Sequence, residues 1–334
     1  MTAKKFTKAG IVGAGAWGTA LAAVCRRAGL DTLVWAFEPE VAAEINGAHE
    51  NKTFLPGIPL DPAIRATHET ARLMDRDVLF LVTPAQFTRG VVEKLEGIPS
   101  SVPLVICSKG IEAKSGKLMS EAVREARPKN PLLVLSGPSF AADVAKGKPT
   151  AVTLAGEDHD LVHALGGAFG LPAFRPYFAG DIVGAEVGGA IKNVLAIACG
   201  IALGKNLGDS ARAALITRGL AEMIRFAKAR GGKAATLMGL CGLGDTVLTC
   251  SSLQSRNFSL GVAIGEGKKA KEILAERKGV TEGVATAAVV ARLAKELSLD
   301  MPIALAVNAI LHEGADVDAA IEALLRRPFS EEAL

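Results

Sequence analysis

The chain has 334 residues, of which 36 are glycine and 4% are aromatic. Glycine therefore makes up about 11% of the chain against an ordinary usage of about 7%, and no Gly-x-y period accompanies it, which excludes a collagen-like fibre. A hydrophobic fraction of 49% excludes general disorder, and a net charge of +3 gives no nucleic-acid footprint. The extra glycine must serve tight turns, close helix contacts or a main chain that approaches a ligand.

Cysteine usage and hydropathy point to a cytoplasmic protein without a membrane span. The five cysteines lie in apolar stretches without a Cys-x-x-Cys pair, so reduced core thiols are expected. The longest uncharged apolar run, at 194–204, has 11 residues, fewer than a membrane span needs. The N-terminal residues lead straight into a predicted strand, without the apolar region of a signal peptide.

The first half of the chain alternates short apolar runs with helical patterns. Helices are expected at Thr19–Ala28 and Leu118–Ala126, among others. Strands are expected near Ala9–Val12, Thr32–Ala36, Val78–Thr83, Leu104–Ser108, Leu132–Ser136 and Thr150–Leu154. Strands and helices in alternation favour βαβ units and a mainly parallel sheet.

The second half of the chain is predicted to be all-α. Helical patterns lie near 182–203, 211–230, 257–266, 284–297, 303–313 and 317–326. An Ala-Gly-Asp turn near Phe178–Asp181 marks the expected boundary. We therefore predict an α/β domain over residues 1–180 and a helical domain over residues 181–334.

The segment Gly13-Ala-Gly15-Ala-Trp-Gly18 follows the first predicted strand and opens an alanine-rich helix. That context is the one required for a dinucleotide-binding fingerprint. Gly13 allows the tight turn, Gly15 lets the backbone approach a pyrophosphate, and Gly18 lets the helix pack on the strand. The alternative is a chance glycine turn.

Glu38 lies at the end of the second predicted strand. A carboxylate there accepts a hydrogen bond from a ribose 2′-hydroxyl and repels a 2′-phosphate, which favours NAD over NADP. A cation from another loop, such as Lys52, would reduce that preference. Glu38 also reads as a surface acid at a helix start.

Lys192 is the one cation between Ile182 and Gly204, a largely apolar helical stretch in which Glu186 is the only other charged residue. A buried lysine is costly unless it has a partner or a chemical task, and desolvation makes it a usable general acid or base. Gly188 and Gly189 lie on the same helical face and leave room for a ligand over the ammonium. The alternative is a lysine that extends to solvent at a domain edge.

Asp245 follows a glycine turn, and Thr249 lies four residues later on the same helical face. The alternative for Asp245 is a helix N-cap. Ser255 is a candidate cap for the next helix, and Arg256 is a candidate phosphate ligand or an ordinary surface arginine. His159 and His163 are spaced for a metal, but no third ligand is evident.

Two further segments follow predicted strands, where parallel sheets bind ligands: Lys109 after the fourth strand, and Gly137 and Ser139 after the fifth. The alternative for Lys109 is a solvated turn lysine.

Several segments, in this order, resemble the bacterial NAD(P)-dependent glycerol-3-phosphate dehydrogenase family, and the match spans nearly the whole chain. They are Gly13–Ala20, Ser108–Gly110, Ser136–Phe140, Gly188–Asn193, Ala214–Glu222, Gly242–Asp245, Gln254–Asn257 and Val280–Gly283.

The resemblance implies a Rossmann domain, an α-helical domain and an active site in the cleft between them. It implies reversible hydride transfer between sn-glycerol 3-phosphate and dihydroxyacetone phosphate with NAD or NADP, for phospholipid synthesis. It also implies a homodimer that needs no metal. Lys192 matches the family's general acid/base.

The resemblance also assigns binding positions. Substrate contacts fall on Lys109, Gly137, Ser139, Asp245, Ser255, Arg256 and Asn257. Dinucleotide contacts fall on Gly13, Gly15, Ala16, Trp17, Gly18, Phe37, Phe87, Lys109, Ala141, Arg256, Val280 and Glu282.

The chain departs from the family pattern at two places. Many bacterial members carry a basic residue where this chain has Phe37 and Glu38. In this chain the ring of Phe37 is expected to lie against adenine. The loop after the Lys192 helix reads Ala202-Leu-Gly-Lys-Asn-Leu-Gly208 instead of the usual acidic and aromatic pattern, which bears on the dimer contacts or the cleft rim.

Two rival functions remain: a dehydrogenase for another hydroxy acid or phosphosugar, and a catalytically silent dinucleotide sensor.

Overall fold

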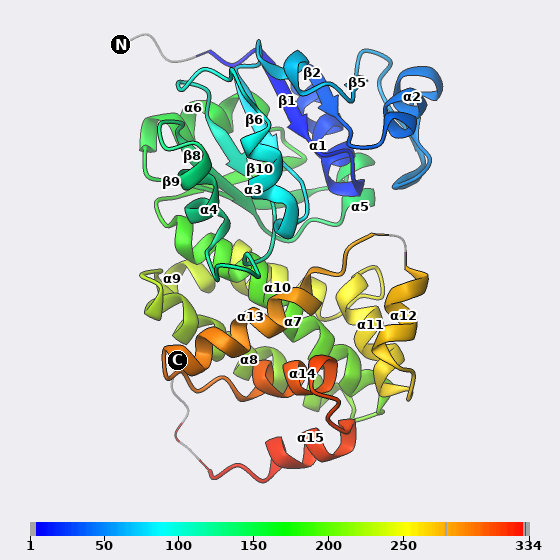
Figure 1. Ribbon diagram of the computed structural model, residues 1–334, viewed down its shortest axis with the longest axis vertical. Helices are drawn as coiled ribbons and strands as arrows, with labels where there is room; N and C mark the ends of the chain where they lie inside the picture. Colours follow the sequence, from blue (N-terminus) through cyan, green and yellow to red (C-terminus); the bar gives the residue numbers. More distant parts are fainter. Residues whose placement is uncertain (1–4, 278, 330, 332–334) are drawn as a thin grey trace. The chain divides into compact units, whose positions relative to one another are not determined.

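The computed structural model describes residues 5–277, 279–329 and 331, and these form two compact units. Unit 1 holds the described residues up to Ser108 together with Met119–Ile182. Unit 2 holds Lys109–Leu118 and the described residues from Val183 onward. The ten residues from Lys109 therefore belong to the second unit although they precede the end of the first in sequence (Figure 1).

Unit 1 is built on an eight-stranded sheet in the order β10-β9-β8-β7-β6-β1-β2-β5. The strands are β1 (Lys8–Val12), β2 (Asp31–Trp35), β5 (Arg65–Thr67), β6 (Val78–Leu81), β7 (Leu104–Ile106), β8 (Leu132–Ser136), β9 (Thr150–Gly156) and β10 (Phe174–Ala179). All neighbouring pairs are parallel except β8 and β9. The prediction of a mainly parallel Rossmann sheet is confirmed, with the dinucleotide-binding strand order around β1.

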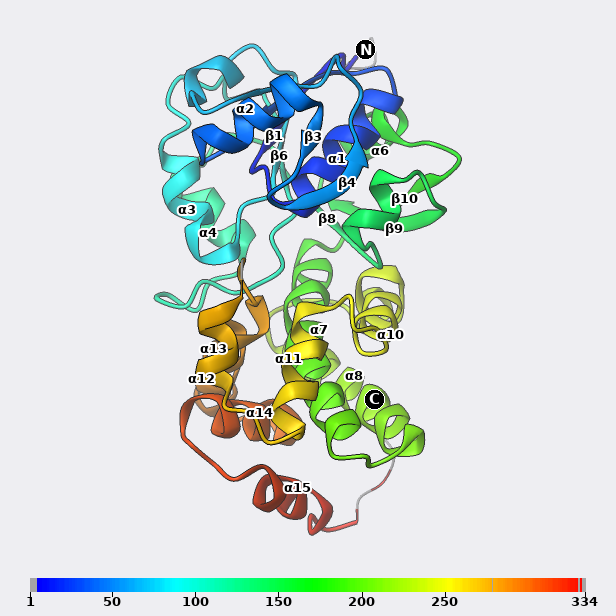
Figure 2. The same cartoon turned by 90° about the vertical axis from the view of Figure 1, so that its right-hand side faces the viewer.

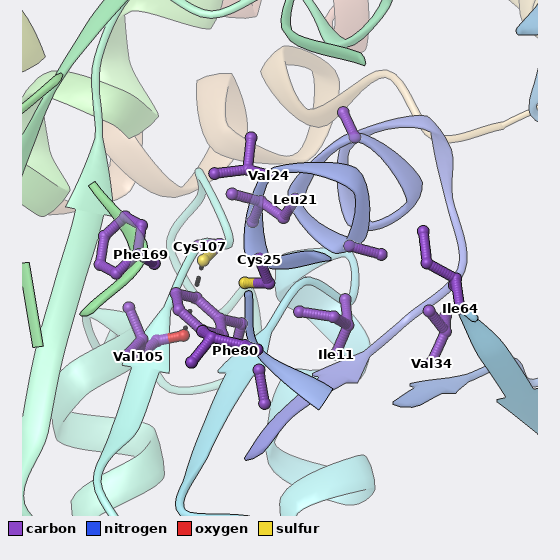
Figure 3. Packing of buried hydrophobic residues seen from close by; sticks show 14 of the residues in the cluster. Ile11, Leu21, Val24, Cys25, Val34, Ile64, Phe80, Val105, Cys107 and Phe169 are labelled. Atoms are coloured by element: carbon purple, nitrogen blue, oxygen red, sulfur yellow. Dashed lines mark hydrogen bonds between the residues drawn. The ribbon is translucent and has the colours of Figure 1, made fainter. Parts of the chain in front are cut away.

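The helices of unit 1 connect these strands. They are α1 (Ala16–Arg27), α2 (Pro39–Ala48), α3 (Ala85–Glu93), α4 (Met119–Ala126), α5 (Ala141–Ala145) and α6 (His159–Phe169), with a 3₁₀ turn at Thr70–Leu73. Strand β6 is buried along its whole length, as expected for a strand covered on both faces. Figure 3 shows the core between sheet and helices, where Phe80 and Phe169 meet edge to face with ring centroids 5.5 Å apart.

Four strands were absent from the sequence prediction. The hairpin of β3 (Glu50–Asn51) and β4 (Leu55–Pro59), and strand β5, are two to five residues long, too short for a clear alternation. Strand β10 is an edge strand that contains Pro176, and a proline within an apolar run weakens its sequence signal. The strand continues through Phe178 to Ala179, so the predicted boundary region Phe178–Asp181 begins inside the strand.

Unit 2 is helical, as predicted. Its elements are α7 (Ile182–Gly204), α8 (Asp209–Ala229), α9 (Ala234–Leu237), a π-helical turn (Leu240–Gly244), α10 (Asp245–Thr249), α11 (Arg256–Gly265), α12 (Ala270–Glu276), α13 (Glu282–Glu296), α14 (Pro302–His312) and α15 (Val317–Leu325) (Figure 2). Helix α7 is long and apolar enough to cross a membrane, but 83% of its most apolar window is buried inside the protein.

Helices α7 and α11 cross with their backbones in contact. A Cβ added at Gly200 would lie 2.1 Å from the Phe258 carbonyl oxygen, and one at Gly261 would lie 2.1 Å from that of Ile197. Only glycine fits this crossing, because neither helix backbone can move aside cheaply. The close approach brings α11 against the C-terminal part of α7.

Glu222, in the segment Ala214–Glu222 that carries part of the family resemblance, has a structural role. Its buried carboxylate accepts hydrogen bonds from the backbone N–H groups of Ile303 at 2.7 Å and Ala304 at 3.1 Å, at the start of α14. Burial raises the pKa of Glu222 to about 7, while these two hydrogen bonds oppose the rise. The residue therefore fastens α14 to α8.

Candidate functional site: a carboxylate between two lysines

A single carboxylate in unit 2 holds two ammonium groups. Asp245 Oδ1 lies 2.7 Å from Lys192 Nζ, and its Oδ2 lies 2.7 Å from Lys109 Nζ. Lys192 Nζ also donates to Thr249 Oγ1 at 2.8 Å, and that hydroxyl donates to Asp245 at 3.1 Å. Asp245 is 1% exposed, Thr249 3% and Lys192 7%. The sequence predicted Asp245 and Thr249 on one helical face and singled out Lys192 and Lys109 in other segments, and the structure brings the four side chains together.

The local backbone explains how Asp245 reaches Lys192. Asp245 is the first residue of α10, directly after the π-helical turn, and its side chain caps nothing. The predicted alternative of an N-cap is therefore wrong, because the carboxylate accepts ammonium protons instead. A Cβ at Gly188 would lie 2.4 Å from the Cys241 carbonyl oxygen. The space over Gly188 thus holds the main chain that carries Asp245, and the expectation of ligand room there is wrong.

The electrostatics of the cluster favour a reactive lysine. Burial lowers the pKa of Lys192 to about 8; Asp245 opposes this effect and Lys109 adds to it. Burial alone would raise the pKa of Asp245, but the two ammonium groups hold it below its usual value. Lys192 therefore exchanges its proton near neutral pH while Asp245 stays charged, an arrangement suited to general acid–base chemistry.

A chain of buried side-chain amides runs beside the lysine cluster. Asn193 donates to the Lys109 carbonyl oxygen at 3.2 Å, and its Oδ1 accepts from Asn257 Nδ2 at 2.9 Å. Asn257 Oδ1 accepts from the Gly283 N–H at 2.9 Å. These bonds join α7, α11 and α13 to the Lys109 segment. Asn193 was given no role from the sequence, although it adjoins Lys192.

The start of α11 carries the candidate anion ligands. Ser255 is the N-cap, as predicted, and its Oγ accepts from the Phe258 N–H at 3.2 Å. Arg256 is exposed; partial desolvation lowers the pKa of its guanidinium, and Glu282 opposes the shift. Arg277, which the sequence did not single out, donates to the Arg256 carbonyl oxygen. Val280 and Glu282 lie at the start of α13.

The glycine turn in unit 1 fits a dinucleotide phosphate. Gly13 has φ +119°, and a Cβ there would lie 2.9 Å from the Val82 carbonyl oxygen. A Cβ at Gly18 would lie 1.9 Å from the Gly13 carbonyl oxygen. At Gly15 a Cβ would meet nothing within 4 Å, so the protein itself does not demand glycine there. Open space beside an uncapped helix N-terminus, at Ala16 and Trp17, suits an anionic ligand that approaches the backbone.

The remaining candidates of unit 1 lie at loops and helix starts. Phe37 and Phe87 are 72% and 60% exposed, unusual for large aromatic side chains. Gly137 has φ +147° in the turn after β8, and Ser139 Oγ donates to its carbonyl oxygen at 2.9 Å. Ala141 begins α5. Phe37 follows β2 and leads into the exposed Glu38.

The described residues contain no cluster of three or more metal-ligating side chains. His159 and His163 stack on α6, and their Nε2 atoms lie 3.2 Å apart.

Replacing Asp245 by asparagine should destabilise the protein, because two ammonium groups lose their shared counter-charge. We expect Asp245→Asn to lower the free energy of unfolding by about 3 kcal/mol at neutral pH, measured by urea denaturation. The loss should shrink as the pH falls below about 4, where the unfolded chain takes up the proton first, and should vanish once the folded-state carboxylate, whose pKa is lower, is also protonated. The exposed pair of Asp209 and Arg212 gives the control: Asp209→Asn should change stability by less than about 0.5 kcal/mol. Equal effects of the two variants would contradict the prediction.

Two family models cover most of the chain. The N-terminal model of NAD-dependent glycerol-3-phosphate dehydrogenase matches residues 8–162, and the C-terminal model matches residues 181–322. Glycerol-3-phosphate dehydrogenase [NAD(P)+] of Parvibaculum lavamentivorans is 53% identical over 328 residues, covering 98% of each chain. The corresponding protein of Hyphomonas neptunium is 54% identical over 330 residues, with the same coverage.

Among solved structures, glycerol-3-phosphate dehydrogenase from Coxiella burnetii superimposes with a TM-score of 0.92 at 38% identity, covering 97% of this chain and 99% of the other. The chain therefore belongs to the family of NAD-dependent glycerol-3-phosphate dehydrogenases, oxidoreductases that use NAD(P) and act on a CH–OH group.

Proposed function

We propose that the chain interconverts sn-glycerol 3-phosphate and dihydroxyacetone phosphate, with Lys192 as the general acid/base. The observation that carries the proposal is the pairing of the buried Asp245 with the buried Lys192 and the partly buried Lys109 in a chain of this family. A reducible carbonyl needs a proton donor at its oxygen, and Lys192 is a desolvated ammonium whose pKa burial lowers to about 8. The product glycerol 3-phosphate would supply phospholipid synthesis in the cytoplasm, where the five buried free thiols stay reduced.

Each side chain of the cluster has one task in this proposal. When bound, the nicotinamide dinucleotide supplies or accepts the hydride. Lys192 donates a hydrogen bond to the substrate oxygen and then its proton as negative charge develops there. Asp245 and Thr249 fix the position of the Lys192 ammonium. Lys109, paired with the other carboxylate oxygen, is a second cation for the polar end of the substrate.

The phosphate of the substrate finds its ligands at the start of α11. Arg256 offers a guanidinium that binds phosphate bidentately, and the helix N-terminus adds backbone N–H groups around Ser255 and Asn257. Binding energy from this unreactive end orients the carbonyl at Lys192. Gly137 and Ser139 are further substrate contacts in the proposal.

The dinucleotide would be held by the glycine turn and by the aromatic and polar groups that the family resemblance assigns to it. Its phosphates would lie at Gly13, Gly15 and the N-terminus of α1, where the open space at Gly15 admits them. Phe37 would stack on adenine. The other proposed contacts are Ala16, Trp17, Gly18, Phe87, Lys109, Ala141, Arg256, Val280 and Glu282.

Removing the Lys192 ammonium should abolish most of the activity. We expect Lys192→Ala to lower kcat by about 10² or more, in an assay that follows NADH oxidation with dihydroxyacetone phosphate. In the unaltered enzyme, kcat/KM for reduction should fall above pH about 8, because the acid form of Lys192 is lost, while kcat/KM for oxidation should rise. Circular dichroism of the variant checks the fold. Near-normal turnover in a folded variant would refute the role, and no turnover of the unaltered protein with NADH or NADPH would favour a dinucleotide sensor.

We also propose that the enzyme prefers NAD over NADP because Glu38 follows β2. Its carboxylate would repel a 2′-phosphate on the adenosine ribose. Glu38→Ser should raise kcat/KM for NADPH relative to NADH by about fivefold, since one exposed charge pair is worth about 1 kcal/mol. Glu40→Ser, an exposed acid two residues further on, should leave the ratio unchanged. An unchanged ratio in Glu38→Ser would contradict the assignment.

The protein is proposed to act as a homodimer. Leu203 at the end of α7 is 40% exposed, and Leu207 in the loop after it is 43% exposed. The N-terminal half of α8 leaves Leu215 and Ile216 half-exposed. Exposed apolar side chains of this kind on unit 2 are what a second copy would cover.

Light scattering should give about 69 kDa in solution, twice the 34.5 kDa of one chain. Leu207→Glu should shift the mass toward one chain, because a buried charge opposes association. Leu325→Glu, at an even more exposed leucine on α15, should not shift it. A single-chain mass for the unaltered protein would contradict the dimer.

A further inference from the structure

The hairpin of β3 and β4 carries a buried polar side chain that the proposed reaction does not use. Asn51 is 0% exposed, although it lies in a two-residue strand beside the exposed Lys52. Its side chain makes three hydrogen bonds. Nδ2 donates to the Ala14 carbonyl oxygen at 2.7 Å and to Thr19 Oγ1 at 2.8 Å, and Oδ1 accepts from the Phe54 N–H at 2.9 Å.

Two of these contacts fall on the glycine turn and on the helix that follows it. Ala14 lies between Gly13 and Gly15, and Thr19 is in the first turns of α1. Thr19 continues the network, since its hydroxyl donates to the Gly15 carbonyl oxygen at 3.0 Å and its N–H donates to the same oxygen at 2.9 Å. Both donor hydrogens of Asn51 and its acceptor oxygen are therefore occupied.

The hydrogen bonds to the carbonyl groups of Ala14 and Gly15 also determine where the backbone N–H groups of the glycine turn point. In a planar trans peptide the C=O and the next N–H point to opposite sides. Because Asn51 holds the Ala14 carbonyl inward, the Gly15 N–H points away from the hairpin. Because Thr19 holds the Gly15 carbonyl, the Ala16 N–H likewise points away from the helix body. A Cβ at Gly15 would meet nothing within 4 Å, so the space beside this turn is open.

We infer that Asn51 is a positioning residue for dinucleotide binding, which holds the glycine turn with its N–H groups directed at the phosphates. A turn that is already held in its bound conformation loses less entropy when the ligand binds. The inference rests on the dinucleotide binding proposed above. It assigns a function to the β3–β4 hairpin, which packs against α1 through this network (Figure 2).

The test replaces the donor amide by an acceptor of the same size. In Asn51→Asp the carboxylate faces the Ala14 carbonyl and cannot donate to it. Isothermal titration with NADH should give a Kd about tenfold higher, the size expected when a buried hydrogen bond is lost. The kcat at saturating NADH and the KM for dihydroxyacetone phosphate should stay within about twofold, since the cluster in unit 2 is untouched.

The matched control uses a second asparagine of unit 1. Asn46 also makes two bonds to a backbone, donating to the Ala66 carbonyl oxygen and accepting from the Ala66 N–H at 2.9 Å each, but its partner strand is β5. Asn46→Asp should lower the melting temperature without changing the Kd for NADH. An equal rise in Kd for both variants would make the effect one of general stability and overturn the inference.

A second pair of variants decides the question if Asn51→Asp fails to fold. Thr19→Val removes the hydroxyl that links Asn51 to Gly15 and should raise the Kd for NADH. Thr19→Ser retains the hydroxyl and should keep the Kd of the unaltered protein. An unchanged Kd in a folded Thr19→Val or Asn51→Asp variant would overturn the inference.

Hydrogen exchange of the Gly13 and Thr19 amides in the free protein gives a readout that needs no ligand, because these amides anchor the two ends of the turn. Exchange should be faster in Asn51→Asp. If the unaltered protein binds no dinucleotide, this exchange still tests the support of the turn, and the failure belongs to the proposed function.

Discussion

The arrangement of unit 2 depends on the buried carboxylate of Asp245. Two ammonium groups and a hydroxyl converge on its oxygens at 2.7 to 3.1 Å, so neither Lys192 nor Lys109 carries an uncompensated charge. Without that partner, a buried lysine would lose its proton or its ammonium group would move to solvent. The carboxylate also explains why Lys109 and the residues after it belong to unit 2, although the chain has just left β7 of unit 1.

Glycine residues at close backbone contacts and hydrogen bonds from asparagine side chains fix the positions of the groups around Asp245. Gly188 admits the main chain of the π-helical turn against α7, and Gly200 with Gly261 lets α7 and α11 touch. That crossing places Asn193 and Asn257 in hydrogen-bond contact. The same two features recur in unit 1, where Gly13 and Gly18 allow the tight turn and Asn51 donates a hydrogen bond to the Ala14 carbonyl oxygen. Rigid support of this kind keeps binding groups oriented before a ligand arrives.

The sequence predicted correctly those features that depend on one continuous segment of the chain. The apolar runs at β1, β6 and β8 and the fingerprint at Gly13–Gly18 are continuous segments, so fold class and dinucleotide turn followed directly. Lys192 stood out because a charge in an apolar helix is costly. Sequence reasoning missed β3 and β4 because they are too short to show a periodicity of their own, and it missed β10 because this edge strand contains Pro176.

The sequence by itself determined the two-part α/β and helical plan, the glycine turn and the individual candidates Lys192, Asp245 and Lys109, since composition and spacing are local properties. Only the tertiary structure decided that Lys109 and Lys192 share one carboxylate, because they are 83 residues apart and Asp245 is 53 residues beyond Lys192. It also decided that the space at Gly188 holds backbone while that at Gly15 stays open. These facts depend on which segments fold together, and no spacing within a single segment records them.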